Sequence, residues 1–227
     1  MKKFGCISPS VLNLPWDMQD ALPPGLSVAV VTLNVRNGLP GEYERALGIQ
    51  RGAADVLIDE GCGAIVAFGV PVSAKRGYAA EKAALNELTA DRGAVPITSS
   101  LAASALRFLE LSARRPLLVT QYASDVNEQL LAFYRDAGLE PAGAVGLGAR
   151  NAAEVNALGP EDFYHLAQRA IRENPSADGI FLSARGNLLE VARKMEAGIQ
   201  LPVVDQVQAA VWWAGSVLDV PSPVHAS

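Results

Sequence analysis

Short, continuous apolar runs alternate with segments of helical spacing along the whole chain, and this alternation constrains the fold more than any other feature. Runs such as "LSVAVVTLN", "GAIVAFGV" and "DGIFLSA" are strand-like. Segments whose apolar residues recur every three to four positions lie between them. Strands that are apolar at every position are typical of parallel sheets covered by helices on both faces. The sequence therefore predicts an α/β protein built from βα repeats.

Two stretches of the chain share one pattern, which indicates an internal duplication. "VPITSSLAASALRFLEL" (95–111) and "LPVVDQVQAAVWWAGSVL" (201–218) both read as an apolar-Pro step, a strand, a polar turn and a helix of small residues. The preceding segments, "AFGVPVSAKRG" and "FLSARGNLLEV", also correspond. We interpret the chain as two related halves of roughly one hundred residues each, although any two βα units share these general features. Matching turns that face each other across a cleft would favour carboxylates, because helix N-termini attract anions.

Charge and cysteine content argue against several classes of partner. The 227 residues carry a formal net charge of −5, whereas nucleic acids and anionic membranes attract basic surfaces. No apolar run has the length of a membrane-spanning helix, and the N-terminal sequence does not resemble a signal peptide. Cys6 and Cys62 lie in apolar strand-like runs without zinc-site spacing. We expect reduced, buried thiols and a cytoplasmic location.

The segment "TQYASDVNEQLLAFYRDAGLEP" (120–141) resembles the Tyr-x-x-Asp-Val-Asn-Glu motif of arylmalonate decarboxylases. The stretches "ISPS", "GVPVSAKRG", "SADGIFLSA" and "LPVVDQVQAA" occur in the order in which that family and the related maleate cis-trans isomerases carry their motifs. The resemblance covers nearly the whole chain and extends to the aspartate/glutamate racemase superfamily. It implies an α/β fold of two pseudo-symmetric flavodoxin-like lobes, each a short parallel sheet flanked by helices. The site would lie between the lobes and need no metal or organic cofactor.

On this basis we assign residues 1–97 and about 206–227 to an N-terminal lobe, and residues 98–205 to a C-terminal lobe.

The chain departs from the motifs it resembles at both turns. Racemases of the superfamily carry one catalytic cysteine in each turn, and decarboxylases keep only the second. Gly69 stands at the first cysteine position and Ala184 at the second. Val70 and Pro71 stand where the decarboxylases have hydroxyl donors, although valine has no hydroxyl and proline lacks even the backbone N–H. Two-cysteine racemisation is therefore the activity that the sequence argues against most clearly.

The resemblance implies that Tyr122 donates a hydrogen bond to an enediolate, so we expect it to be catalytic. Arg185 is the second catalytic candidate, because a guanidinium binds a carboxylate through two hydrogen bonds. The alternatives are that Tyr122 only packs at a strand end and that Arg185 faces solvent. The candidate substrate-binding residues lie in the loops and turns that follow strands: Ser10, Asn13, Asn34, Gly69, Val70, Pro71, Ala184 and Gly186.

Three further polar side chains have an ordinary structural explanation. Ser73 and Ser183 could donate hydrogen bonds to a ligand, but we expect both to cap helices. Asp205 could act as a base if it is desolvated, and a helix-capping aspartate is the more ordinary interpretation.

The sequence thus predicts a cofactor-independent lyase or isomerase that acts on a small carboxylate through an enediolate or carbanion intermediate. The alternative is a catalytically inactive carboxylate-binding protein on the same scaffold. A weaker third hypothesis is a lyase or hydratase that uses Asp205 or a serine. The expected ligand is a small carboxylate, and the expected assembly is a monomer or homodimer.

Overall fold

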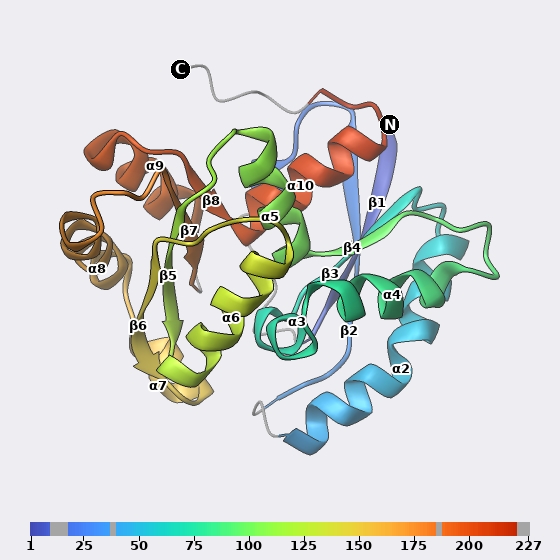
Figure 1. The fold of residues 1–227 in the computed structure, drawn as a ribbon. Coiled ribbons are helices and arrows are strands. Elements are labelled where there is room, and N and C mark those ends of the chain that lie inside the picture. The colour runs from blue at the N-terminus through green and yellow to red at the C-terminus, as the bar shows by residue number, and fades with distance from the viewer. Residues whose placement is uncertain (10–17, 37–39, 185–187, 222–227) are drawn as a thin grey trace.

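The computed structural model describes residues 1–9, 18–36, 40–184 and 188–221, and Figure 1 shows their arrangement. The described strands form two separate four-stranded sheets in which every neighbouring pair is parallel. The first sheet has the order β2-β1-β3-β4 and the second the order β6-β5-β7-β8. Adding four to each strand number of the first order gives the second, so the two halves share one topology. The predicted two-lobed α/β fold and its internal duplication are confirmed.

The strands of the first sheet are β1 (Lys2–Ser8), β2 (Leu26–Thr32), β3 (Ala64–Ala67) and β4 (Ile97–Ser99). Those of the second are β5 (Pro116–Tyr122), β6 (Gly143–Ala149), β7 (Gly179–Ser183) and β8 (Val203–Asp205). The described helices are α1 (Met18–Ala21), α2 (Pro40–Asp59), α3 (Val70–Arg76), α4 (Tyr78–Thr89), α5 (Ser100–Glu110), α6 (Ser124–Asp136), α7 (Ala152–Ala157), α8 (Pro160–Glu173), α9 (Leu188–Ile199) and α10 (Gln206–Val217).

Helices cover both faces of each sheet, as the continuous apolar strands predict. In the first sheet, α2 and α4 pack on one face, and α10 with α1 on the other. In the second sheet, α8 and α9 pack on one face, and α5 and α6 on the other. Burial of these apolar faces from water is the main favourable contribution to folding.

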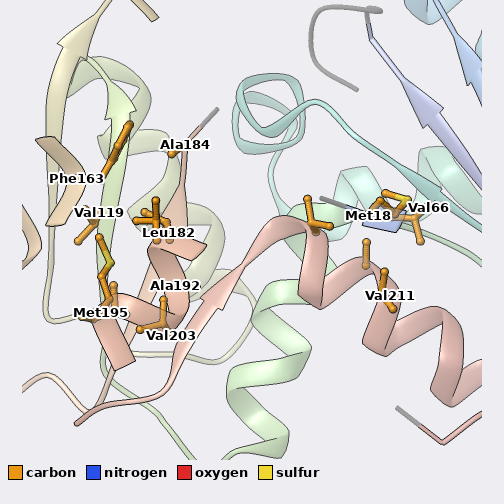
Figure 2. Close-up of a cluster of buried hydrophobic side chains, with 14 of the residues drawn as sticks. Met18, Val66, Val119, Phe163, Leu182, Ala184, Ala192, Met195, Val203 and Val211 are labelled. Atoms are coloured by element: carbon orange, nitrogen blue, oxygen red, sulfur yellow. The ribbon is translucent and has the colours of Figure 1, made fainter. Parts of the chain in front are cut away.

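The last helix of each half packs on the sheet of the other half. Helix α5 follows β4, yet its Phe108 packs with Phe181 of β7 in the second lobe. Helix α10 follows β8, yet its Val211 shares a cluster with Met18 and Val66 of the first lobe, as Figure 2 shows. The two exchanged helices also pack against each other. This exchange ties the lobes together.

The division into residues 1–97 with about 206–227 and residues 98–205 stays a prediction. It places α10 with the first sheet and α5 with the second. The boundary between residues 97 and 98 falls inside β4, so β4 is the element that the division cuts.

Two local expectations differ from the structure. The segment "GVPVSAKRG" is not an open turn, because helix α3 begins directly after Gly69, whose carbonyl accepts hydrogen bonds from the N–H groups of Val72 and Ser73. The pyrrolidine of Pro71 is tolerated in this first turn, where backbone N–H groups lack partners in any helix. The segment that resembles the family motif also suggests a side-chain cap for the following helix at Ser124 or Asp125, but the N-cap of α6 is Ala123 and no side chain caps it.

Within the part of the chain that the structure describes, no helix combines the length and the apolar character that a membrane crossing requires.

Candidate active site

The strand order locates a candidate ligand site in each sheet. In the first sheet the connections diverge between β1 and β3, and in the second between β5 and β7. Open parallel sheets bind ligands outside the carboxyl ends of strands at such a switch point. In this chain those ends are Ser8 of β1, the turn at Gly69 after β3, Tyr122 of β5 and Ser183 of β7.

Helices α3 and α6 bring the two switch points near each other. Helix α3 begins directly after the β3 turn, and α6 begins two residues after Tyr122. The helices pack side by side between the sheets (Figure 1). Val70 of α3 belongs to the same buried cluster as Leu130 and Phe133 of α6, and Tyr122 packs against that cluster. The turn after β3 in the first lobe therefore lies against the carboxyl end of β5 in the second lobe.

A small hydrogen-bond network fixes the backbone of Tyr122. The hydroxyl of Thr120 donates to Oδ1 of Asn127 at 2.7 Å and accepts from the N–H of Tyr122 at 3.1 Å. Nδ2 of Asn127 donates to the carbonyl of Tyr122 at 3.3 Å. Thr120 and Asn127 are both buried. This closed network explains the asparagine of the "DVNE" segment: Asn127 holds the end of β5 in place.

Gly146 on the neighbouring strand β6 is part of the same arrangement. A Cβ at this position would lie 2.0 Å from the carbonyl oxygen of Tyr122 and 2.5 Å from Nδ2 of Asn127. The pairing of β5 with β6 shifts register between Thr120 and Tyr122, and such an irregularity re-aims a side chain at the end of a strand. The sequence analysis identified Tyr122 but not the residues that hold its backbone in place. Thr120 and Asn127 could have been found because both lie in the quoted segment 120–141 beside Tyr122.

Ser183 is the polar group on the neighbouring strand end. Its Oγ donates to the Tyr122 hydroxyl at 3.4 Å, and none of the side chain is exposed. Ser183 lies inside β7, while α9 begins at Leu188. The expected cap role is therefore wrong for Ser183. It is also wrong for Ser73, which lies inside α3 and donates to Glu81 at 2.7 Å.

The turn after β3 presents little polarity. Gly69 has φ of 135°, a conformation that side chains rarely adopt. Val70 is only 2% exposed because it packs into the cluster between α3 and α6, and Pro71 is half-buried. Ala184 at the end of β7 is also buried. Substrate contact by these four residues stays a prediction.

The other candidate residues lie elsewhere or outside the described residues. Asn34 is exposed in the loop after β2, an edge strand, and its Oδ1 accepts from Nε of Arg36 at 3.2 Å. Its position away from the switch point gives no support to a binding role. The remaining four candidates fall in segments that the structure does not describe: Ser10, Asn13, Arg185 and Gly186.

Asp205 caps helix α10, as the ordinary interpretation predicted. Its Oδ1 accepts from the N–H groups of Val207 at 2.7 Å and Gln208 at 2.9 Å. Ser99 caps α5 in the equivalent position of the first half, accepting from the N–H of Ala102. Because Asp205 and Ser99 occupy equivalent positions in the two halves, this correspondence indicates a structural, helix-capping role for both side chains.

Neither cysteine lies at a switch point. Cys6 is inside β1, paired with Val30 and Val66 and fully buried, and this burial raises the pKa of its thiol far above the ordinary value. Cys62 precedes β3 at the opposite, amino end of the strand, and burial also raises the pKa of its thiol. A raised pKa keeps a thiol protonated and poorly nucleophilic. The strand ends are thus without sulfur.

No group of three or more metal-binding side chains comes together in the ranges given above.

Comparisons of the sequence and of the structure with known proteins both find arylmalonate decarboxylases. The family model of arylmalonate decarboxylase matches residues 6–226. The arylmalonate decarboxylase of Bordetella bronchiseptica is 30% identical over 210 residues, which cover 92% of this chain and 87% of that protein. A crystal structure of arylmalonate decarboxylase superposes with a TM-score of 0.80 at 29% identity, over 95% of this chain and 92% of the other.

The maleate isomerase of Pseudomonas putida S16 has a TM-score of 0.85 at 20% identity, over 97% of this chain and 94% of the other. At that identity the likeness shows a common fold alone.

Proposed function

Because the chain belongs to the arylmalonate decarboxylase family, we propose that it is a decarboxylase of small, malonate-type carboxylates. The observation that carries this proposal is the placement of Tyr122. Its hydroxyl stands at the carboxyl end of β5, beside the switch point, on a backbone held by Thr120, Asn127 and Gly146. A rigidly positioned donor is what stabilisation of a developing oxyanion requires.

The proposed reaction breaks one carbon–carbon bond of the substrate. The electron pair of that bond stays on the α-carbon and spreads over the remaining carboxylate as an enediolate, while carbon dioxide leaves. The Tyr122 hydroxyl donates to one enediolate oxygen and lowers the barrier. The turn at Val70 and Pro71 offers the departing carboxylate no side-chain hydroxyl, which favours loss of its charge, because neutral carbon dioxide needs no hydrogen-bond donors.

The relative from Bordetella bronchiseptica is named for arylmalonates, and we propose the same class here. A panel of phenylmalonate, methylmalonate, maleate and amino acids tests it, with carbon dioxide release, isomer formation and racemisation measured separately. Decarboxylation of a malonate with neither isomerisation nor racemisation is the expected result. Racemisation of an amino acid without decarboxylation would reject the proposal.

Catalysis without a thiol gives a separate prediction. The double variant Cys6→Ala/Cys62→Ala is expected to keep wild-type kcat, because both sulfurs lie away from the strand ends. Iodoacetamide at pH 7 is expected to leave the native enzyme active, since burial raises the pKa of the Cys6 thiol and suppresses the reactive thiolate. A large loss of turnover in a folded double variant would show that a thiol takes part.

A carboxylate-binding protein without turnover is the second candidate function. The observation that favours it is the hydroxyl-free, sulfur-free turn at Gly69, Val70 and Pro71. Thermal stabilisation by phenylmalonate with no product formed would select this candidate. Thermal stabilisation together with release of carbon dioxide would reject it.

The cap of α10 uses Oδ1 of Asp205, and the weaker hypothesis of catalysis by Asp205 stays a prediction. The absence of a cofactor, the cytoplasmic location and the monomer or homodimer state stay predictions.

A further inference from the structure

Ser183 and Tyr122 form a hydroxyl pair that spans the switch point of the second sheet. The two side chains come from adjacent parallel strands, in which Thr120 of β5 pairs with Ser183 of β7. Ser183 Oγ donates to Tyr122 Oη at 3.4 Å. Ser183 is fully buried, so water does not compete for this hydrogen bond, whereas Tyr122 is only half-buried.

Both hydroxyls lie on the face of the sheet that is turned toward α3. Alternate residues of a strand point to the same face. Ser183 therefore shares its face with Phe181. Tyr122 follows the register irregularity of β5, and its face is given by its packing against the cluster that contains Leu118 and Phe181. Phe181 and Leu118 belong to the buried cluster that contains Val70 of α3. The pair is thus directed at the turn after β3 in the first lobe, where we propose that the substrate binds.

The direction of the hydrogen bond determines what the phenol can do next. A hydroxyl that accepts a hydrogen bond through a lone pair still has its own hydrogen to donate to another acceptor. Ser183 therefore orients the Tyr122 O–H away from β7. Ala184, directly after Ser183, stands where the family resemblance places a cysteine. Ser183 therefore lies next to the position of the thiol that this chain lacks.

We infer that Ser183 is a positioning residue for Tyr122, and that the Tyr122 hydroxyl, held by Ser183, returns the proton to the carbanion after carbon dioxide has left. This inference rests on the proposed function. In the step, the O–H bond of Tyr122 breaks and a C–H bond forms at the α-carbon from the electron pair of the enediolate. The phenolate is held by the Ser183 hydrogen bond until water restores its proton. One turnover consumes one proton from solvent and releases one carbon dioxide.

The experiment compares Ser183→Ala, Ser183→Thr and the wild type with phenylmalonate as the probe. In Ser183→Ala we expect kcat to fall about tenfold with KM nearly unchanged, because the substrate contacts remain. The basic limb of the pH–kcat profile should move to higher pH, since the phenolate loses a donor and the phenol ionises less readily. Ser183→Thr keeps the hydroxyl and should restore both values. Ser100→Ala is the matched control: this buried serine has no hydrogen-bond partner among the described residues, so turnover should not change.

Unchanged kcat and an unchanged pH profile in folded Ser183→Ala would overturn the inference, as would failure of Ser183→Thr to restore them in a folded protein. A wild type that turns over no malonate would overturn the proposed function instead. The pair is then tested by ultraviolet difference titration, in which subtraction of Tyr122→Phe isolates the Tyr122 ionisation. Ser183→Ala should move that ionisation to higher pH, and no movement would overturn the positioning role by itself.

Discussion

Replacement of Tyr122 by phenylalanine is expected to lower kcat for phenylmalonate by about two to three orders of magnitude. The substitution removes one oxygen atom, which both stabilises the enediolate and supplies the proton in the proposed mechanism. The ring still packs against the cluster of α3 and α6, and the network of Thr120 and Asn127 bonds to the backbone rather than to the phenol. Steady-state kinetics and thermal unfolding of the same preparation measure the loss of activity and the retained fold.

Tyr43→Phe is the matched control for this result. Tyr43 is a half-buried tyrosine of α2 that packs against the cluster on the α2 face of the first sheet, and not against the cluster of α3 and α6 on which Tyr122 packs. The control should keep wild-type kcat. A Tyr122→Phe variant that is folded and as active as Tyr43→Phe would contradict the assignment of Tyr122 as a catalytic residue.

The parts of the fold that follow from local patterns could be predicted from the sequence. Apolar runs and helical spacing are set by residues close together in the chain, and they identified the βα repeats and the duplication of the β4–α5 and β8–α10 units. The assignment of α5 and α10 to opposite lobes came from the family resemblance and not from local patterns, because it depends on contacts between distant residues such as Phe108 and Phe181. Periodicity shows that a helix has an apolar face but not which sheet covers it.

The candidate site likewise contains residues that the sequence could identify and residues whose roles only the structure shows. Tyr122 was identified because it lies in a motif that resembles a known family, and Asp205 was correctly interpreted as a cap because capping is local. The roles of Asn127 and Ser183 were missed, since each depends on which atom of another segment comes within hydrogen-bond distance. Both residues form hydrogen bonds with Tyr122, so in the proposed mechanism the functional unit is one phenol with its supporting residues rather than a set of separate catalytic groups.

Substitution of Gly146 by alanine is expected to be the most destabilising single-methyl change near this unit. The new Cβ would lie 2.0 Å from the carbonyl oxygen of Tyr122, which is backbone and cannot rotate away. Strand β6 must therefore separate from the end of β5, with loss of the Asn127 hydrogen bond to Tyr122. We expect the free energy of unfolding to fall by about 3 kcal/mol, with a drop in Tm of roughly 6–12 °C. Differential scanning calorimetry measures the shift.

Gly52→Ala is the control that separates crowding from a general effect of alanine. Gly52 lies in α2, where a Cβ would meet no atom within 4 Å, so alanine should stabilise the protein by about 0.5–1 kcal/mol through its higher helix propensity. The two substitutions add the same methyl group and should shift Tm in opposite directions. Gly146→Ala should also lower kcat, because displacement of the end of β5 moves Tyr122 from its position, whereas Gly52→Ala should leave kcat unchanged. Equal stability of the two variants would show that the strand end is not held as tightly as its role in orienting Tyr122 requires.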